Sequence, residues 1–509
     1  MIKQNYNQNK ILDIFSLFLL SLFLYLIMFP FQWTDNEFMY FGMAEFYHLN
    51  NMENYSFFHT NKTKFPFGYL HGKVINLFGY DYTWFFGRFF LIAIYFLSLL
   101  SFTKSIKIKP YILLISLVIF YLLKQNFFLG GEWFFQGFES RAFCYIIFLF
   151  SFELLIKKKF KIFLSLNIIS FYFHFLTGFY SFMFLILFYL IYSKNLKNTL
   201  YLLIAYFVFC LPLILIGLIE NFQVSEIDHD YIYHKRVEHL VSAFDENNMI
   251  FRKHLLGYIL IFASSITLLF IKFKFNPFKE KNMFLESLLA SSLFINLYFF
   301  LVLIIDYFDT NHFFSKFYLY RPGSYALLIQ LLIILPFFLN YLNKKFIKLL
   351  IVLIIVSPIF HSKINIYNIT KVSFNILLRS FDEKIVKLNN DELELINWVK
   401  KNSDPKDIFL IEETYTKKNI NIRVTGFEQN VKRPTVVNEH HVYGSQKDIQ
   451  RWHKLIVEKR KIFEGNCNNK IINYKFLVFF DKKNKENFLQ KCKSTIVFEN
   501  RSASILEII

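Results

Sequence analysis

The sequence predicts a polytopic α-helical membrane protein that carries a small C-terminal soluble α/β domain. Of its 509 residues, 55% are hydrophobic and 70 are Phe. The apolar residues gather in runs long enough to cross a bilayer, which takes about 20 residues per helix. After residue 361 these runs give way to mixed polar and apolar sequence. The first two observations predict the membrane domain, and the third predicts the soluble domain.

About eleven apolar runs are expected to form the transmembrane domain of residues 1–361. The first run is too long for the apolar core of a signal peptide and lacks a small-residue cleavage site, so we assign it as a spanning helix. Some runs are short for a full crossing, which leaves re-entrant or merged segments open. The runs are Ile11–Phe31, Tyr82–Phe102, Tyr111–Leu123, Ala142–Leu155, Ile162–Leu176, Phe179–Ile191, Leu200–Ile219, Leu255–Ile271, Met283–Ile305, Pro322–Leu342 and Phe346–Phe360.

The charges of the connecting loops predict how these helices are oriented. Alternate loops hold 18 Lys and one acid, Glu280, whereas the other loops are longer and hold nearly all the acids. Because loops rich in Lys and Arg stay in the cytoplasm, the N-terminus is expected inside. An odd number of spans then places residues 362–509 on the periplasmic or extracellular side of the cell (inner) membrane.

The outer side is expected to consist of four loops and the tail domain of residues 362–509. The loops lie at residues 32–81, 124–141, 220–254 and 306–321. In the tail, hydrophobic periodicity predicts an amphipathic helix, two buried strands and a closing hairpin. These elements lie at Glu392–Lys401, Ile408–Ile411, Phe476–Phe480, and Ser494–Phe498 with Ala503–Ile509.

Two further compositional features concern partners and disulfides. The net charge of +19 comes largely from short Lys clusters between apolar runs, where it sets topology. We therefore expect the lipid bilayer, and no nucleic acid, among the partners.

Cys467 and Cys492 are the only cysteines of the tail, and an oxidising compartment makes them candidates for a disulfide.

Histidine and arginine fall on the predicted outer face. All ten His and all five Arg before residue 362 lie in, or at the membrane edge of, the outer loops. Arginine binds phosphate or carboxylate through a planar two-point contact that lysine lacks. This placement favours an outer-face site, although longer loops also need structural ion pairs. The Arg residues are Arg88, Arg141, Arg236, Arg252 and Arg321.

Asp35 and Glu37 follow the first span directly, in the stretch Trp33-Thr34-Asp35-Asn36-Glu37. Two carboxylates at the membrane surface suit a shared general-base role or the binding of a divalent cation. The alternative is a solvated helix N-terminus, where acids complement the helix dipole. We predict Asp35 or Glu37 as the catalytic residue.

A second group of candidates surrounds the fourth span. Glu132 follows a Gly pair that permits close backbone approach, and Glu139 and Arg141 lead into the span. The alternative for Glu139 and Arg141 is a structural ion pair with each other. His174, in the short outer hairpin of residues 174–178, lies at the bilayer edge, where an ionisable group is a functional candidate.

The remaining candidates come from the later outer loops. Arg236 and His239 lie in a loop that is dense in His and acidic residues, so we considered a zinc site there. No HExxH or CxxC spacing supports such a site. Arg321 precedes Pro322, which suits the first turn of a helix, so its charge adds to the positive end of the helix dipole. Interfacial anchoring is the alternative for Arg321. Together with Arg88, these residues are predicted to bind substrate.

These features together resemble the GT-C superfamily of membrane glycosyltransferases, and within it bacterial members with a C-terminal extracytoplasmic α/β domain. The specific stretches are Asn397–Pro405 followed by Ile408–Ile411, Tyr474–Phe480 with Val497–Ile509, Glu139–Arg141, and Arg236–Leu240. The resemblance implies transfer of a sugar from a polyprenyl-phosphate donor at the outer membrane face. It assigns the family's first-loop catalytic carboxylate to Asp35 or Glu37. The stretch Asp35-Asn36-Glu37 departs from the family's common Asp-Asp or Glu-Asp pair.

The expected reaction is therefore an inverting glycosyl transfer. An outer carboxylate deprotonates the acceptor hydroxyl, and fixed positive charge binds the leaving polyprenyl phosphate. One alternative is a lipid or polysaccharide transporter, which would place ionisable residues deep within the spans. Another is a non-catalytic membrane assembly protein that binds partners through its tail. The sequence identifies neither the donor sugar, the acceptor nor a cofactor, and it leaves a divalent cation open.

Overall fold

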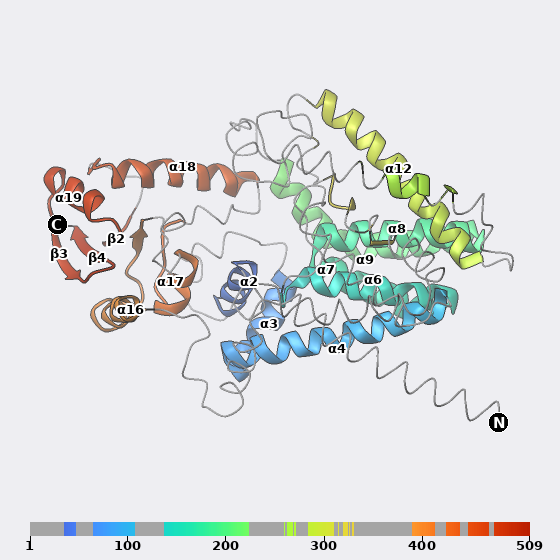
Figure 1. Ribbon diagram of the computed structural model, residues 1–509, viewed down its shortest axis with the longest axis horizontal. Coiled ribbons are helices and arrows are strands. Elements are labelled where there is room, and N and C mark those ends of the chain that lie inside the picture. The colour runs from blue at the N-terminus through green and yellow to red at the C-terminus, as the bar shows by residue number, and fades with distance from the viewer. Residues whose placement is uncertain are drawn as a thin grey trace, which may run out of the picture. The chain divides into compact units, whose positions relative to one another are not determined.

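The computed structural model describes residues 35–46, 65–106, 137–222, 259, 262–267, 269–270, 283–309, 314, 319–323, 325, 328–329, 389–412, 424–437, 446–467 and 473–508. These residues are mostly helical, with a small sheet near the C-terminus (Figure 1). The chain divides into two compact units. The helical unit joins Met1–Phe31, Phe85–Pro212 and Asp228–Leu378, and the tail unit joins Gln32–Trp84, Leu213–Ile227 and Arg379–Ile509.

Four helices of the described chain are long and apolar enough to cross a membrane. They are α4 (Tyr80–Ile106), α8 (Phe175–Ser193), α9 (Leu196–Phe222) and α12 (Met283–Phe308). The shorter apolar helices α6 (Ser140–Ile156) and α7 (Phe160–Phe173) pack against α8. By length and composition, these four helices are compatible with insertion into a membrane.

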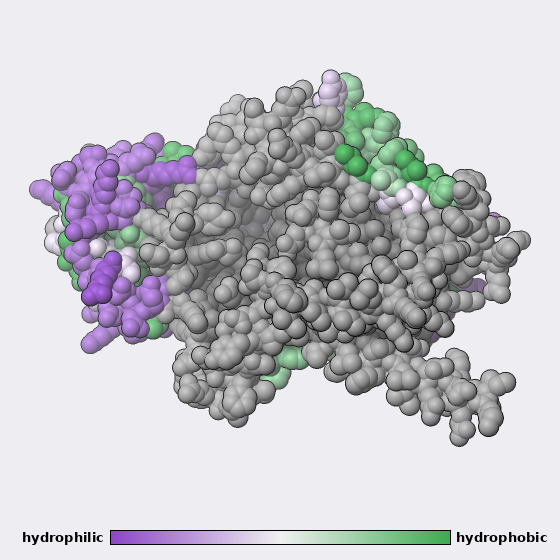
Figure 2. Space-filling view, viewed as in Figure 1, coloured by the Kyte–Doolittle hydropathy of each residue, from purple (hydrophilic) through white to green (hydrophobic). Residues whose placement is uncertain are grey.

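The surface of these helices has the character of a lipid-facing surface. Large apolar side chains of α9 and α12 are more than half exposed, among them Tyr201, Phe209, Phe300 and Phe308. Figure 2 shows hydrophobic residues along α12 and hydrophilic residues over the described part of the tail domain. Exposed apolar surface on this scale is stable in hydrocarbon and unfavourable in water.

Lysines occupy the turns at one end of the α6, α7 and α8 hairpins. Lys157, Lys158 and Lys159 connect α6 to α7, and Lys194 ends α8 in the left-handed conformation (φ 53°). The opposite end carries the sharp α7–α8 turn at His174. A Cβ on Gly178 would lie 2.6 Å from the backbone of Phe171, so only glycine permits α8 to pack this closely on α7.

Six of the predicted spans correspond to helices, namely α4, α6, α7, α8, α9 and α12, with ends displaced by a few residues. The predicted hairpin loop of residues 174–178 was wrong in extent. Only His174 is non-helical, because α8 already begins at Phe175 and Gly178 removes the side chain that would force a wider turn. The spans Ile11–Phe31, Tyr111–Leu123 and Phe346–Phe360, most of Pro322–Leu342 and about half of Leu255–Ile271 lie outside the described residues.

The first outer loop contributes two helices to the tail unit. α2 (Asp35–Phe46) packs on α3 (Phe65–Phe78), and α2 also packs on α17 (Val424–Val431). Gly79 separates α3 from α4 in the left-handed conformation (φ 78°), which glycine adopts without strain.

The tail sheet has the strand order β1-β2-β4-β3. β1 (Phe409–Ile411) and β2 (Phe476–Phe479) are parallel, and β4 (Ser504–Ile508) is antiparallel to both β2 and β3 (Ser494–Glu499). The predicted buried strands and closing hairpin are thus confirmed, as is the predicted helix, here α16 (Asn390–Asn402). A capping box between Asn389 and Glu392 starts α16.

Helices cover both faces of this sheet. Phe409, Ile411 and Val478 pack with residues of α16 and α17, while the alternating Leu410, Leu477 and Phe479 pack with Ile462 and Phe488. Ile462 belongs to α18 (Gln446–Phe463) and Phe488 to α19 (Lys482–Lys491), which lie on the other side of the strands in Figure 1. The period-two alternation of the strands therefore builds two cores.

A disulfide joins Cys467, after α18, to Cys492, after α19, with 5.5 Å between their Cα atoms. The predicted pairing is confirmed. The bridge closes the layer formed by α18 and α19 and leaves Cys144 and Cys210 as the free, buried cysteines of the described chain.

Candidate functional site

Glu37 is a completely buried carboxylate on the first turn of α2. Its Oε2 accepts a hydrogen bond of 3.2 Å from the indole Nε1 of Trp84, at the start of α4. Burying a carboxylate is costly unless hydrogen-bond donors compensate it, so Trp84 fixes the position of Glu37. The alternative of a solvated helix N-terminus therefore does not hold for Glu37. The side chain of Asp35, which opens α2, lies outside the described part of the chain.

Aromatic rings and one histidine form the packing around this part of α2. The ring centroid of His71 lies 4.3 Å from that of Phe41, edge to face, and 5.3 Å from that of Phe67. Burial lowers the pKa of His71 from 6.5 to about 3, because the apolar surroundings disfavour the imidazolium. His71 is thus neutral at physiological pH and adds no positive charge beside α2.

Within the helical unit, Arg141 and Arg321 converge on one buried neighbourhood. Arg141 lies one turn before Cys144 on α6, and Arg321 is near enough for its charge to act on the same thiol; Arg141 likewise acts on Tyr325 and Arg321 on Tyr180. Arg141 and Arg321 are 4% and 8% exposed, so neither is a solvated surface charge. Guanidinium groups in a low-dielectric environment interact strongly with anionic groups, because the surroundings screen their charge weakly.

Glu139 and His174 flank this neighbourhood. Glu139 is buried at the N-cap position of α6, next to Ser140 and Arg141. His174 is buried at the N-cap of α8, where its Nδ1 accepts the backbone N–H of Thr177 at 3.4 Å. The thiol of Cys144 donates to the carbonyl of Ser170 at 3.3 Å, which ties α6 to the end of α7. Pairing between Glu139 and Arg141 stays a prediction.

The segment that carries Arg321 is held by tyrosines. Tyr298 of α12 donates to the carbonyl of Leu319 at 2.9 Å, and Tyr320 donates to the carboxylate of Asp306. Tyr325 donates to the carbonyl of Thr177 at 3.1 Å and packs its ring 4.7 Å from that of Tyr145. Each of these tyrosine hydroxyls donates a hydrogen bond, so their burial is compensated. The three hydrogen bonds hold the segment that carries Arg321 beside the apolar helices.

The other predicted residues divide into one that is buried and three that fall outside the described chain. Arg88 is 1% exposed on α4. Glu132, Arg236 and His239 lie outside the described residues, as does the loop for which zinc was considered. Over the part that the structure covers, no group of three or more His, Cys, Asp or Glu is arranged to hold a metal ion.

Two contributing residues, Trp84 and Tyr325, were missed from the sequence. Each looks like one more aromatic residue in a chain that is 21% aromatic. The rarity of Trp, with five in the chain, is the signal from which Trp84 could have been found. For Tyr325 the sequence holds no signal, because its partner is a backbone carbonyl 148 residues away.

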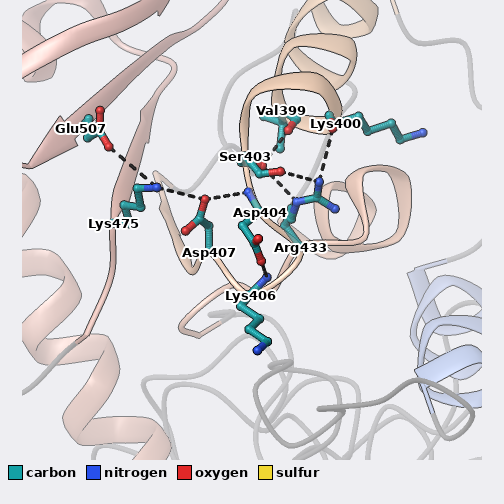
Figure 3. A network of polar contacts seen from close by, with 9 residues as sticks. All are labelled: Val399, Lys400, Ser403, Asp404, Lys406, Asp407, Arg433, Lys475 and Glu507. Atoms are coloured by element: carbon teal, nitrogen blue, oxygen red, sulfur yellow. Dashed lines mark hydrogen bonds and ion pairs between the residues drawn. The ribbon is translucent and has the colours of Figure 1, made fainter.

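The tail stretch Asn397–Pro405 has a structural role that Figure 3 shows. Arg433 donates to the carbonyls of Lys400 and Ser403 and to the hydroxyl of Ser403, at 2.8–3.3 Å. These carbonyls end α16, where a cation also favours the negative end of the helix dipole. Asp407 accepts from the backbone of Asp404 at 2.8 Å and from Lys475 at 3.2 Å (Figure 3). The network fixes the turn between α16 and β1.

Glu412 occupies the carboxyl end of the parallel strands β1 and β2, where open α/β sheets commonly bind ligands. Its carboxylate accepts the backbone N–H groups of Phe480 and Asp481 at 2.6 and 2.8 Å, and the side-chain amide of Asn484 at 2.6 Å. These donors, at the start of α19, are the kind that bind a phosphate. The protein's own carboxylate therefore fills this position.

The two constellations offer different chemistry. The tail unit presents a buried carboxylate held by an indole, which suits proton abstraction from a hydroxyl. The helical unit presents buried guanidinium groups near tyrosine hydroxyls, which suits binding of a phosphate or carboxylate. No family model matches this sequence, and a search of curated proteins finds no significant relative.

Proposed function

We propose that this protein is a membrane glycosyltransferase of the GT-C type that transfers a sugar from a polyprenyl-phosphate donor at the outer membrane face. The observation that carries the proposal is Glu37: a fully buried carboxylate, fixed by Trp84, that follows the first predicted span. A carboxylate has a high desolvation cost, so retaining one in such a position is typical of a functional group.

In the proposed reaction, a carboxylate of the first outer loop takes the proton of the acceptor hydroxyl. Glu37 is our first candidate and Asp35 the second. The hydroxyl oxygen then bonds to the anomeric carbon, and the bond from that carbon to the phosphate oxygen breaks. The polyprenyl phosphate leaves with the electron pair, and fixed positive charge stabilises its negative charge.

The proposed topology has about eleven spans, with the N-terminus inside and the tail domain outside. It is supported by the Lys residues at the α6–α7 and α8–α9 turns, at the opposite hairpin end from His174. Alkaline phosphatase fused after Ile509 should be active, and a fluorescent protein fused there should be dark. The reverse pattern would contradict the orientation.

The function is tested with the purified protein in lipid nanodiscs, supplied with radiolabelled polyprenyl-phosphate hexoses and pentoses and with a cell-envelope extract as the source of acceptor hydroxyls. Wild-type protein should release polyprenyl phosphate from one of them. Glu37→Gln keeps an oxygen for the Trp84 hydrogen bond but is a far weaker base, and should cut turnover about 10²-fold or more. Asp35→Asn tests the second candidate, and Glu286→Gln, an exposed acid of α12, is the control.

The outcomes distinguish the reaction from the assignment. If wild-type protein releases polyprenyl phosphate from none of the donors, the glycosyltransferase proposal fails. If it does so and both first-loop variants retain full turnover, the reaction stands and the base has been assigned to the wrong residues.

A further inference from the structure

The exposed face of α3 is largely apolar, which is unusual for a helix face in contact with water. The buried face consists of Phe67, Gly68, His71, Gly72 and Ile75, which pack toward α2. A helix that is buried on one side normally shows charged and polar residues on the other. The exposed side of α3 instead shows Leu70, Val74, Leu77 and Phe78, which are 53%, 41%, 77% and 62% exposed.

The exposed side is itself divided lengthwise into an apolar and a polar stripe. Leu70, Val74 and Leu77 follow the i, i+4, i+7 spacing, so they form one stripe along the helix. Tyr69, Lys73 and Asn76 form the neighbouring stripe, in which the Lys73 ammonium lies 4.7 Å from the centre of the Tyr69 ring. An apolar stripe beside a stripe with Tyr and Lys is typical of a helix that lies in a membrane interface.

The chain also fixes how far α3 can be from the bilayer. α3 ends at Phe78, Gly79 is the only residue before α4, and the apolar part of α4 that can cross a membrane begins at Tyr82. The hydrogen bonds of Gly79 N–H to Ile75 at 2.7 Å and of Thr83 N–H to Gly79 at 3.2 Å make this junction compact. Phe78 is exposed at the end of α3, and Tyr82, Phe86 and Phe90 are exposed at successive turns of α4.

We infer that α3 is an interfacial helix that lies on the lipid surface, with Leu70, Val74, Leu77 and Phe78 among the acyl chains and Lys73 at the headgroups. The partner is the phospholipid bilayer itself. Because α2 packs on the buried face of α3, the lipid contact also sets the depth of Glu37 relative to the membrane. The lipid contact does not depend on the glycosyltransferase proposal.

The inference is tested by depth-dependent fluorescence quenching in the full-length protein. Cys144 and Cys210 are replaced by Ala, the Cys467–Cys492 disulfide is kept, and single cysteines at Leu70, Leu77 or Asn76 are labelled with a small fluorophore. The protein is reconstituted in phosphatidylcholine–phosphatidylglycerol vesicles with or without lipids that carry a nitroxide on the acyl chain. Asn76 is the matched control, because it is exposed on the same helix but on the polar stripe.

We expect the acyl-chain nitroxide to quench the labels at Leu70 and Leu77 strongly and the label at Asn76 weakly. Equal quenching at all three positions would overturn the interfacial orientation, and no quenching at Leu70 and Leu77 would overturn the lipid contact. If the Leu77 cysteine instead cross-links between two copies of the chain and is protected from the nitroxide lipid, a second copy covers this face and the inference is wrong. Elution of each variant as wild type in detergent confirms that it is folded.

Discussion

The indole of Trp84 reaches the carboxylate of Glu37, 47 residues earlier in the chain, and donates to it at 3.2 Å. This single contact ties the start of α4 to the first turn of α2. We predict that Trp84→Phe, which keeps the aromatic ring and removes the donor, lowers the kcat for donor turnover about tenfold, because a mispositioned base transfers protons poorly. Donor KM should change little. Trp398→Phe in the tail is the control, and a wild-type kcat in Trp84→Phe would contradict the positioning role.

One conservative substitution at Arg321 distinguishes a role in phosphate binding from a role in anchoring the helix. Arg321→Lys keeps the charge but loses the two-point guanidinium contact, so we expect a clear rise in donor KM, and near loss of activity in Arg321→Ala. Arg451→Lys, at an exposed tail position, should behave as wild type. Wild-type kinetics in Arg321→Lys would show that the residue only anchors its helix.

His71 makes the α2–α3 pair sensitive to acid. Its folded-state pKa of about 3 lies below the value of 6.5 expected in the unfolded chain. Between these two pH values the unfolded state binds the proton and the folded state does not, so stability is present above pH 6.5 and is lost as the pH falls. At a pH of about 5, the loss is roughly 2 kcal/mol.

Hydrogen exchange of the α2 and α3 amides at neutral and acidic pH measures this loss. His71→Phe keeps a ring against Phe41 and cannot titrate, so its protection should fall much less on acidification than that of wild type. His453→Gln, in α18, is the control for removing a histidine elsewhere. An unchanged acid response in His71→Phe would assign the sensitivity to another group.

Arg433 stabilises the end of α16 through hydrogen bonds to the carbonyls of Lys400 and Ser403. Arg433→Ala leaves these carbonyls without their charged donor, so we expect the free energy of opening of α16 to fall by about 2–4 kcal/mol. Arg433→Lys should recover only part of it, because one ammonium cannot reproduce the fork. Hydrogen exchange of the α16 amides reads this out, with exposed Arg501→Ala as control, and equal protection in all three variants would refute the role.

The Cys467–Cys492 bridge should make no thiol available in the tail of the unreduced protein. Alkylation after denaturation without reductant should label Cys144 and Cys210 alone, whereas two further labelled thiols would show that the bridge is absent. The double variant Cys467→Ser with Cys492→Ser should lower the stability of the tail domain by about 3 kcal/mol, the chain-entropy value for a loop of this size. Urea-dependent proteolysis of the full-length protein measures this change.

The sequence by itself determined the apolar helices, the strands and α16, but α2, α3, α17, α18 and α19 were not predicted. Runs of apolar residues identify α4, α8, α9 and α12 because a helix in hydrocarbon must be apolar along its whole length, and that property is local. The strands β1 and β2 and the hairpin of β3 and β4 follow from the same kind of local pattern. The candidates Glu139, Arg141, His174 and Arg321 were found because polar groups are conspicuous in an apolar chain.

Only the tertiary structure decided which polar groups meet. The hydrogen bond that Trp84 donates to Glu37 and the one that Tyr325 donates to the carbonyl of Thr177 both join residues far apart in sequence. The sequence left open whether the acids of the first loop are solvated, and packing of α2 on α3 buries Glu37 completely. Hydropathy reports where a segment is stable, but hydrogen-bond partners depend on how segments pack, and packing is a property of the whole fold.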